Sequence, residues 1–383
     1  MRVSYDGWKP VQPESLPMAK PNVFRTCDTA LIWPRMPSAG DASILVMDIQ
    51  LSQSQSYDAE RLQALQLNQL SGLIDHAFAT VPFYRDRLTS VCTASEATNL
   101  TTGLTIDMWR QIPILKRDEV VKAGAKLQST AVPSSFDPIT GASTSGTTGD
   151  PVTIKKSSVD QLFFHANRLR AHRWTGVEFS KPMANITVLN AHTKKLADQN
   201  KAVPWAAGHV SGPMYYCDTN RPVDDKIDWL LKTKVAYLMT SPSSLRDLIT
   251  RSKARNISFE TLSHIICTGE PLSGDTRALC DEEWSLPVWD IYSTQEAGII
   301  AAQCPDHEHL HTMAESLMVE VLDNNDTPCQ PGQTGRVVVT PLQNFVMPLI
   351  RYEIGDQTEV GEAVCSCGRG LPVIKHIQRV TPS

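Results

Sequence analysis

The clearest periodic pattern in the chain lies between Asp58 and Thr80. Its apolar residues recur every three or four positions, at Leu62, Leu65, Leu70, Leu73, Ile74, Ala77 and Phe78. This spacing places them on one face of an α-helix. Val81-Pro82 follows, and the residue before a proline avoids the helical conformation. The pattern therefore predicts an amphipathic helix that ends before Pro82.

The middle of the chain, from residue 140 to residue 300, alternates between two patterns. Apolar residues at helical spacing predict helices at 159–169 and 227–231. Short runs of apolar and β-branched residues predict four strands, at Ile186–Leu189, Val235–Met239, His264–Cys267 and Val288–Tyr292. Helices that alternate with strands indicate an α/β fold.

The two ends of the chain have other patterns. Residues 1–57 are rich in Pro, Ser and Asp and show little periodicity, which predicts an irregular arm with one short strand at Ser43–Met47. After about residue 304, strand-like runs at Leu317–Leu322 and Arg336–Thr340 flank a turn-forming Pro-Gly segment. We therefore expect an arm (1–57), an α/β core (58–303) and a small β subdomain (304–376).

The composition narrows the class of protein. The chain has 383 residues, of which 41% are hydrophobic, and 36 Lys+Arg against 41 Asp+Glu give a net charge of −5. No excess of positive charge is available to bind a nucleic acid or an anionic membrane. No apolar run approaches the about 20 residues of a membrane helix, and the N-terminus lacks the apolar core of a secretory signal. Nine cysteines, mostly isolated, fit reduced thiols. We expect a cytoplasmic protein without nucleic-acid or membrane partners.

One loop concentrates groups that could bind phosphate. Four hydroxyls and two glycines stand in eight residues, Thr144 to Pro151. Glycines let a backbone approach an anion closely, and hydroxyls with backbone N–H groups can surround phosphate oxygens. The loop is neither a Walker loop nor a dinucleotide-binding loop. A flexible surface turn remains the alternative. The candidate residues are Thr144, Ser145, Gly146, Thr147, Thr148 and Gly149.

The loop resembles the phosphate-binding loop of the adenylate-forming superfamily, which contains acyl-CoA synthetases, peptide-synthetase adenylation domains and luciferases. Three further segments resemble motifs of this superfamily in the same order: Gly269-Glu270-Pro271, Tyr292-Ser293-Thr294-Gln295-Glu296 and Pro348–Asp356. Three others resemble segments of its phenylacetate-CoA ligase-like branch: Ala77–Arg85, Ile112–Asp118 and Cys365–Arg369. The resemblance implies the large N-terminal domain of an adenylate-forming enzyme, with stacked β-sheets flanked by helices and a small β-barrel-like subdomain.

The resemblance also implies roles for single residues. Glu296 corresponds to the magnesium-side glutamate and is a catalytic candidate together with Thr147 and Thr148. Asp356 corresponds to the carboxylate that holds the ribose hydroxyls. Arg379 corresponds to a ribose-side arginine, although Gln378 precedes it where the family usually has glycine. The implied nucleotide-binding residues, besides the loop, are Gly269, Glu270, Pro271, Tyr292, Ser293, Thr294, Asp356 and Arg379. Ser293 and Gln295 depart from the family's signature, so substrate choice is expected to be unusual.

Three thiols and an imidazole form a candidate zinc site: Cys304, His311, Cys365 and Cys367. Such a ligand set is typical of closed structural zinc sites. The Cys-x-Cys spacing is tighter than the common one, so the sequence alone leaves reduced core cysteines as an alternative. Some phenylacetate-CoA ligase-like proteins carry a similar arrangement, and the resemblance therefore implies zinc. His307 and His309 compete for the imidazole position, and Leu310-His311 corresponds best to the family's Gly-Leu-His.

The implied function is the ATP-dependent activation of a carboxylic acid to an acyl-adenylate, followed by transfer to coenzyme A, with magnesium bound. Transfer to an amine, a protein thiol or another small nucleophile is the alternative, and a non-catalytic binding domain is a third possibility. The aromatic-rich loop Pro204–Tyr216, with Trp205 and Tyr215, favours an aromatic acid. Residues 377–383 correspond to the start of a hinge, and the resemblance implies that the lysine-bearing C-terminal lid domain is absent. A homodimer is an open alternative.

Overall fold

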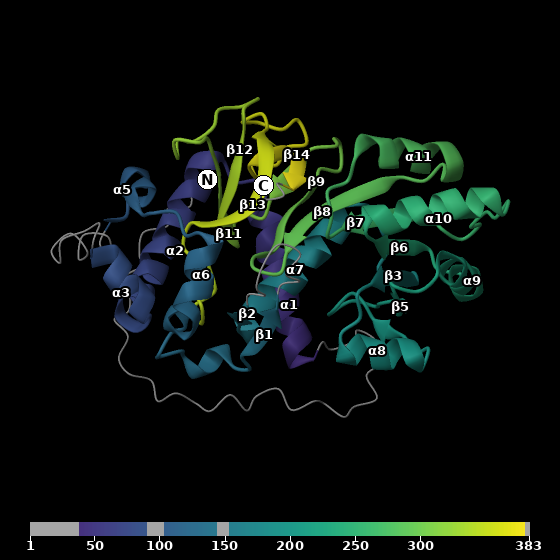
Figure 1. Cartoon of the computed structure of the whole chain (residues 1–383), viewed down its shortest axis with the longest axis horizontal. Helices are drawn as coiled ribbons and strands as arrows, with labels where there is room; N and C mark the ends of the chain where they lie inside the picture. Colours follow the sequence, from purple (N-terminus) through teal and green to yellow (C-terminus); the bar gives the residue numbers. More distant parts are fainter. Residues whose placement is uncertain (1–37, 90–102, 144–152, 380–383) are drawn as a thin grey trace, which may run out of the picture.

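The computed structural model describes residues 38–89, 103–143 and 153–379. Its centre is one mixed sheet of twelve strands, in the order β11-β12-β13-β14-β10-β9-β8-β7-β6-β3-β5-β4. Helices cover the sheet, so the expected α/β fold is confirmed (Figure 1). Among the described residues, no helix is both long and apolar enough to cross a membrane.

One half of the sheet is parallel and is built from β-α-β units. Its strands are β3 (Met183–Thr187), β5 (Pro213–Asp218), β6 (Tyr237–Thr240), β7 (His264–Thr268) and β8 (Val288–Thr294). The connecting helices are α8 (Ala191–Asp198), α9 (Val223–Thr233), α10 (Pro242–Ala254) and α11 (Gly274–Trp284). The short strand β4 (Val203–Pro204) pairs antiparallel with β5 at the edge. The predicted strands are confirmed here, with β3 beginning three residues earlier than expected.

The other half is antiparallel. It comprises β9 (Gly298–Gln303), β10 (Leu310–Thr312), β11 (Leu317–Leu322), β12 (Thr334–Pro341), β13 (Tyr352–Val360) and β14 (Val373–Arg379). Strand β9 pairs with β8 of the parallel half, and β14 lies between β10 and β13. As predicted, the described part of the chain after residue 304 contains strands and no helix. The sheet runs without a break across the boundary proposed at that residue.

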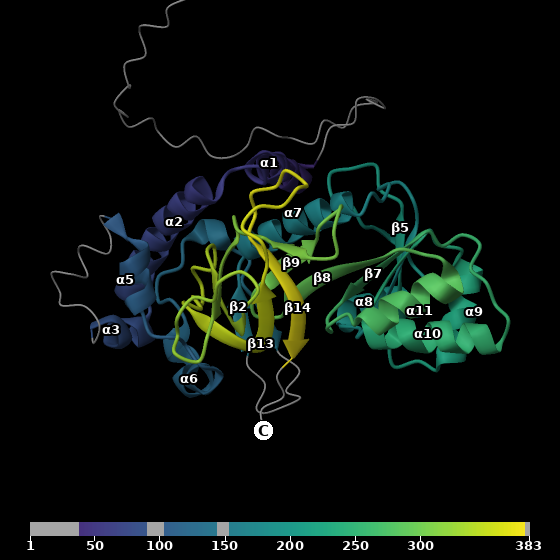
Figure 2. The same ribbon diagram turned by 90° about the horizontal axis from the view of Figure 1, so that it is seen from above.

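Helices from the N-terminal part cover the antiparallel half. They are α2 (Ala59–Thr80), α3 (Pro82–Thr89), α5 (Ile106–Gln111), α6 (Arg117–Ala123) and α7 (Ser158–Trp174), with 3-10 turns at Gly124–Leu127 and Ser134–Phe136. Asp58 caps α2 by accepting the N–H of Arg61. Figure 2 shows α2, α3 and α5 at one end of the molecule and α8 to α11 at the other. Strands β1 (Thr140–Ser143) and β2 (Thr153–Lys156) form a separate antiparallel pair.

The strand predicted at Ser43–Met47 is wrong. These residues lie in helix α1 (Ala39–Ser54), whose N-cap Ser38 accepts the N–H of Asp41. Helix α1 packs on α7, and the Asp48 carboxylate accepts two hydrogen bonds from the Arg173 guanidinium at 2.9 and 2.7 Å. The part of the predicted arm before Ser38 lies outside the described residues. A four-residue apolar run cannot by itself distinguish a strand from one face of a helix.

Candidate functional site

A pocket opens where the parallel and antiparallel halves of the sheet meet. The loop after β7, strand β8, and strands β13 and β14 line it. Seven residues predicted from sequence lie together there: Gly269, Glu270, Pro271, Tyr292, Ser293, Asp356 and Arg379. Asp290, Ile291 and Ile377 complete the lining. In α/β sheets, ligands bind beyond the carboxyl ends of parallel strands, which is where the β7 loop stands.

Tyr292 and Asp356 form the centre of this pocket. The Tyr292 hydroxyl donates to Asp356 Oδ2 at 2.7 Å, and both side chains are buried. Burial raises the pKa of Asp356, while the Tyr292 hydrogen bond and the Arg379 charge oppose this shift. Burial also raises the pKa of Tyr292, so its hydroxyl keeps its proton and remains a donor. The hydroxyl thus holds one carboxylate oxygen, and the other remains available to a ligand.

Arg379 lies at the rim of the pocket. It stands opposite Asp356 on the neighbouring strand, and its Nε is 3.8 Å from Asp356 Oδ1. Its side chain is 58% exposed, so solvent weakens this ion pair.

The loop after β7 is held by helix α10. Gly269 has φ of +87°, a conformation that favours glycine, and this turns the chain out of the strand. The Glu270 carboxylate accepts the backbone N–H of Ser243 at 3.1 Å and the Ser243 hydroxyl at 2.9 Å. Ser243 lies in the first turn of α10, where a carboxylate is stabilised by the helix dipole. Glu270 therefore fixes this loop in place.

Ser293, one of the two departures from the signature that the sequence resembles, has a local partner. Ser293 Oγ lies 3.0 Å from Thr268 Oγ1 on the adjacent strand β7. The Thr294 hydroxyl accepts the N–H of Ala297 at 3.1 Å and shapes the turn between β8 and β9. Of this pair, only Ser293 lines the pocket.

Glu296 stands in that turn, beside two cations. Its side chain is 13% exposed, and its Oε1 lies 3.7 Å from Arg117 Nη1 at the start of α6. Lys156 on β2 is the second cation: burial lowers its pKa, and the charges of Asp160 and Glu296 oppose this shift. Arg117 and Lys156 were not predicted as site residues. The Ile112–Asp118 motif contained a signal for Arg117.

The phosphate-loop candidates Thr144, Ser145, Gly146, Thr147, Thr148 and Gly149 lie outside the described residues. The flanking strands are described, and Ser143 pairs with Thr153. The Asn344 side chain donates to the carbonyl of Lys155 at 3.0 Å and holds β2 against the core.

Asp290 is a pocket residue that the sequence interpretation missed. Burial raises its pKa to about 7, and the nearby Arg277 charge opposes this shift. The signal was present, because Asp290 stands two positions before Tyr292 and residues two apart in a strand share a face.

The aromatic loop is mostly part of the core. Trp205 is 1% exposed, donates from Nε1 to the carbonyl of Lys181 at 2.9 Å, and packs edge-to-face against Tyr237. Tyr215 packs with the hydrophobic cluster under α9 and α10, whereas Tyr216 packs with the cluster on the α7 side of the sheet. Local packing therefore explains Trp205 and Tyr215, and Tyr216 faces α7.

A cluster of thiols and imidazoles lies at the end of β9. The donor atoms of Cys304, His309, His311 and Cys365 all lie within 4.8 Å of one another. Cys304 and Cys365 have their Sγ atoms 3.8 Å apart, and Cys365 Sγ lies 3.2 Å from His309 Nε2. Cys367 Sγ is 3.3 Å from His311 Nε2. The four predicted ligands thus lie together with His309.

The donor set suits zinc. The groups are sulfur and imidazole without a carboxylate, and most of them are buried. Burial lowers the pKa of His311 to about 4, and its Nδ1 lies 3.0 Å from the Leu371 carbonyl, which leaves a neutral Nε2 facing the thiols. His307 is directed instead to Ser366 Oγ, at 2.7 Å. The structure therefore narrows the imidazole ligand to His309 or His311.

Comparison with known proteins shows which fold the chain has. No protein-family profile matches the chain. Among solved structures, 2-hydroxyisobutyryl-CoA ligase superposes with a TM-score of 0.71 at 19% identity, covering 86% of this chain and 70% of the ligase. The fold is therefore that of the large N-terminal domain of adenylate-forming enzymes.

Two sequence relatives are a coenzyme A ligase and an acyl-coenzyme A synthetase. The phenylacetate-coenzyme A ligase of Thermus thermophilus is 27% identical over 319 residues, which cover 81% of this chain and 68% of the ligase. The mitochondrial acyl-coenzyme A synthetase ACSM4 of Rattus norvegicus is 24% identical over 250 residues, which cover 64% of this chain and 42% of the synthetase. The chain is thus similar in sequence to a phenylacetate-coenzyme A ligase and in fold to a coenzyme A ligase of the adenylate-forming type.

Proposed function

We propose that the protein activates a carboxylic acid with ATP and transfers the acyl group to coenzyme A. In the first step a carboxylate oxygen attacks the α-phosphorus of ATP, and the bond to pyrophosphate breaks. In the second step the thiolate of coenzyme A attacks the acyl carbon, and AMP leaves. The pocket at the junction of the sheet carries this proposal, because segments that match the family's motifs converge on it.

The residues of the pocket have separate tasks in binding ATP. Asp356 accepts hydrogen bonds from the ribose hydroxyls, since Tyr292 occupies only one of its oxygens. The loop Gly269–Pro271 and the Tyr292 ring enclose the adenine. Arg379 contacts the ribose from the rim, and Ser293 and Thr294 lie toward the phosphates. The loop Thr144–Gly149 binds the phosphates, and Thr147 and Thr148 are its catalytic residues.

Glu296 holds magnesium at the phosphate end of the site. When bound, magnesium neutralises charge on the phosphates and so favours attack by an anionic carboxylate. Arg117, whose Nη1 lies 3.7 Å from Glu296 Oε1, keeps this carboxylate oriented before the metal binds.

We propose in addition that the cysteine and histidine cluster binds a structural zinc ion. Cys304, Cys365 and Cys367 supply thiolates, and His311 or His309 supplies the fourth ligand. Four protein ligands close the coordination sphere, so the metal serves to hold the β9–β10 hairpin to the loop between β13 and β14.

Pyrophosphate exchange with a panel of carboxylic acids tests the adenylation step. We expect acid-dependent exchange by the wild type and a loss of about a hundredfold or more in Glu296→Gln, because the amide keeps the shape but not the charge. Lys194→Gln, which removes an exposed charge on α8, is the control. Absence of exchange with every acid would reject the proposal.

Addition of coenzyme A tests whether coenzyme A is the acceptor of the acyl group. A thioester product supports transfer to coenzyme A, whereas exchange without a thioester would favour an amine or a protein thiol as acceptor. A cytoplasmic location and a homodimer are also part of this proposal, and cell fractionation and light scattering test them.

A further inference from the structure

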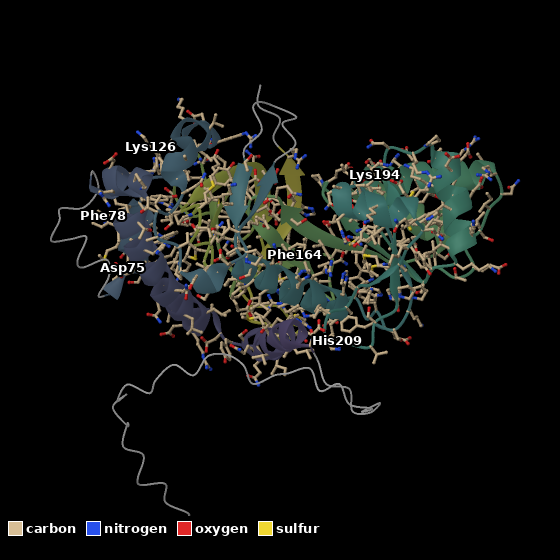
Figure 3. All side chains as sticks on the ribbon, turned by 90° about the horizontal axis from the view of Figure 1, so that it is seen from below. Asp75, Phe78, Lys126, Phe164, Lys194 and His209 are labelled. Carbon is tan, nitrogen blue, oxygen red and sulfur yellow. The ribbon has the colours of Figure 1, made fainter. Side chains whose placement is uncertain are left out.

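One face of α7 carries a phenylalanine and three polar side chains, and it begins beside the turn that contains Glu296. Phe164, His165, Arg168 and His172 lie within about a third of the helix circumference. Phe164, which Figure 3 labels, is 39% exposed, and its Cδ2 would lie 3.7 Å from a Cβ added at Gly298. Gly298 follows Glu296 by two residues. His172, about 12 Å further along the axis, is fully buried.

Arg168 is the unusual member of this face. Among the described residues its guanidinium has no carboxylate partner: Nη2 donates to the Trp205 carbonyl at 3.1 Å, and the enclosed Nε has no hydrogen-bond partner. The other two arginines of α7 are paired with acids: Arg170 lies 2.8 Å from Glu315, and Arg173 lies 2.7 Å from Asp48. An enclosed cation is costly unless it is paired.

In the described part of the chain, the ionisable groups that interact with Arg168 are neutral and cannot compensate its charge. Burial and the Arg168 charge lower the pKa of His165 to about 4 and that of His172 to about 3. Burial raises the pKa of Tyr216 on β5, so its hydroxyl keeps its proton. Among the described residues, Nδ1 of His165 and both ring nitrogens of His172 also have no hydrogen-bond partner. Buried polar atoms are normally hydrogen-bonded, so such a group indicates a polar ligand.

We propose that Arg168 marks the inner end of the acyl pocket and pairs with a second acidic group on the substrate. The substrate class is then a dicarboxylic acid, or an acid with another anionic substituent. This inference rests on the proposed function. The reacting carboxylate lies near Glu296, and the second group extends past Phe164 to Arg168, about 6 Å further along α7.

Matched pairs of acids test this proposal. Adipate is compared with hexanoate, and 4-carboxyphenylacetate with phenylacetate, by pyrophosphate exchange. We expect the wild type to favour the diacid of a pair by at least about tenfold in kcat/KM. Arg168→Gln should lower kcat/KM for the diacid by about ten- to a hundredfold and change that for the monoacid by less than about threefold.

Two further variants make the test specific. Arg168→Lys keeps the charge and should retain part of the diacid preference, which also covers the case in which Arg168→Gln fails to fold. Arg246→Gln removes an exposed arginine on α10 and should change kcat/KM for neither acid.

The outcomes separate this inference from the function on which it rests. The role of Arg168 would be overturned if the wild type had the higher kcat/KM for the monoacids, or if Arg168→Gln lowered kcat/KM equally for both acids. Acid activation itself would then remain in place. Failure to activate any acid would instead reject the proposed function itself.

Discussion

At the scale of single residues, the pocket depends on a carboxylate whose two oxygens differ. Tyr292 donates to one oxygen of Asp356, and this fixes the plane of the group inside a buried strand. In the proposed complex with ATP, a carboxylate held in this way would accept the two ribose hydroxyls without having to reorient. Lys155, by contrast, lies on β2, outside the pocket lining.

We expect Asp356→Ala to weaken ATP binding by at least about tenfold, because charge-assisted hydrogen bonds to the nucleotide are lost. Isothermal titration calorimetry measures this, with Lys155→Ala as the control that retains affinity. Equal affinities of the wild type and Asp356→Ala would remove Asp356 from the ribose site.

The raised pKa of Asp290 predicts that the stability of the protein depends on pH. Burial raises its pKa from 3.8 to about 7, so between these values the folded chain keeps a proton that the unfolded chain releases. The free energy of unfolding contributed by Asp290 therefore falls as the pH rises from about 4 to about 7. Asp290→Asn cannot ionise, and we expect it to gain stability relative to the wild type over this range.

Urea unfolding at pH 5 and pH 8 measures that difference, and Asp281→Asn, an exposed change on α11, is the control. A difference between Asp290→Asn and the wild type that is the same at both pH values would show that Asp290 ionises normally in the folded chain.

At the scale of elements, α1 shows how a distant partner selects a conformation. This helix packs on α7, and the Asp48 side chain, which is 4% exposed, forms an ion pair with Arg173 on that helix. Arg173 Nη1 also donates to Ser52 Oγ at 3.3 Å, one turn after Asp48. The pair therefore joins two helices that are far apart in the sequence.

We expect Asp48→Ala to lower the free energy of unfolding by about 1–2 kcal/mol, since Arg173 is 42% exposed and can be rehydrated. A double-mutant cycle with Arg173→Ala isolates the pair. A coupling energy of zero in urea unfolding would contradict this view of the α1–α7 contact.

The same elements show what the sequence could predict. Several residues that line the pocket could be brought together from the sequence because they stand in contiguous motifs, such as Gly269–Pro271 and Tyr292-Ser293. The helical state of Ser43–Met47 could not be predicted in this way, because α1 packs on α7, and its Asp48 pairs with Arg173, 125 residues further along the chain. The role of Arg168 could not be predicted for a related reason. Whether an arginine has an acidic partner depends on the strands and loops that fold around it, and the sequence of α7 does not show this.

At the scale of the whole molecule, the cysteine and histidine cluster brings together segments that are far apart in the sequence. It connects the β9–β10 hairpin to the loop before β14. In the same loop, the N–H of Gly370 donates to the carbonyl of Gln55 at 2.9 Å, between α1 and α2. The loop is thus tied to both the sheet and the N-terminal helices.

We expect purified protein to contain about one zinc ion per chain, and Cys365→Ser or Cys367→Ser to lose it. Loss of the ion should lower the melting temperature by at least about 5 °C, because bound metal favours only the folded state. Cys329→Ser, a thiol outside the cluster, serves as the control. Unchanged metal content and melting temperature in the cluster variants would argue for reduced core cysteines.

The position of β14 has a consequence for the order of assembly. This strand follows all others of the sheet in the sequence, yet it lies between β10 and β13 and supplies Ile377 and Arg379 to the pocket. Strands made earlier during synthesis cannot close the middle of the sheet until residues 373–379 emerge from the ribosome. The β-α-β half can form as it is made, because its contacts are local, whereas the pairing of β14 with β10 spans more of the chain. We therefore expect a nascent chain to form the proposed nucleotide pocket only after residues 373–379 have been synthesised.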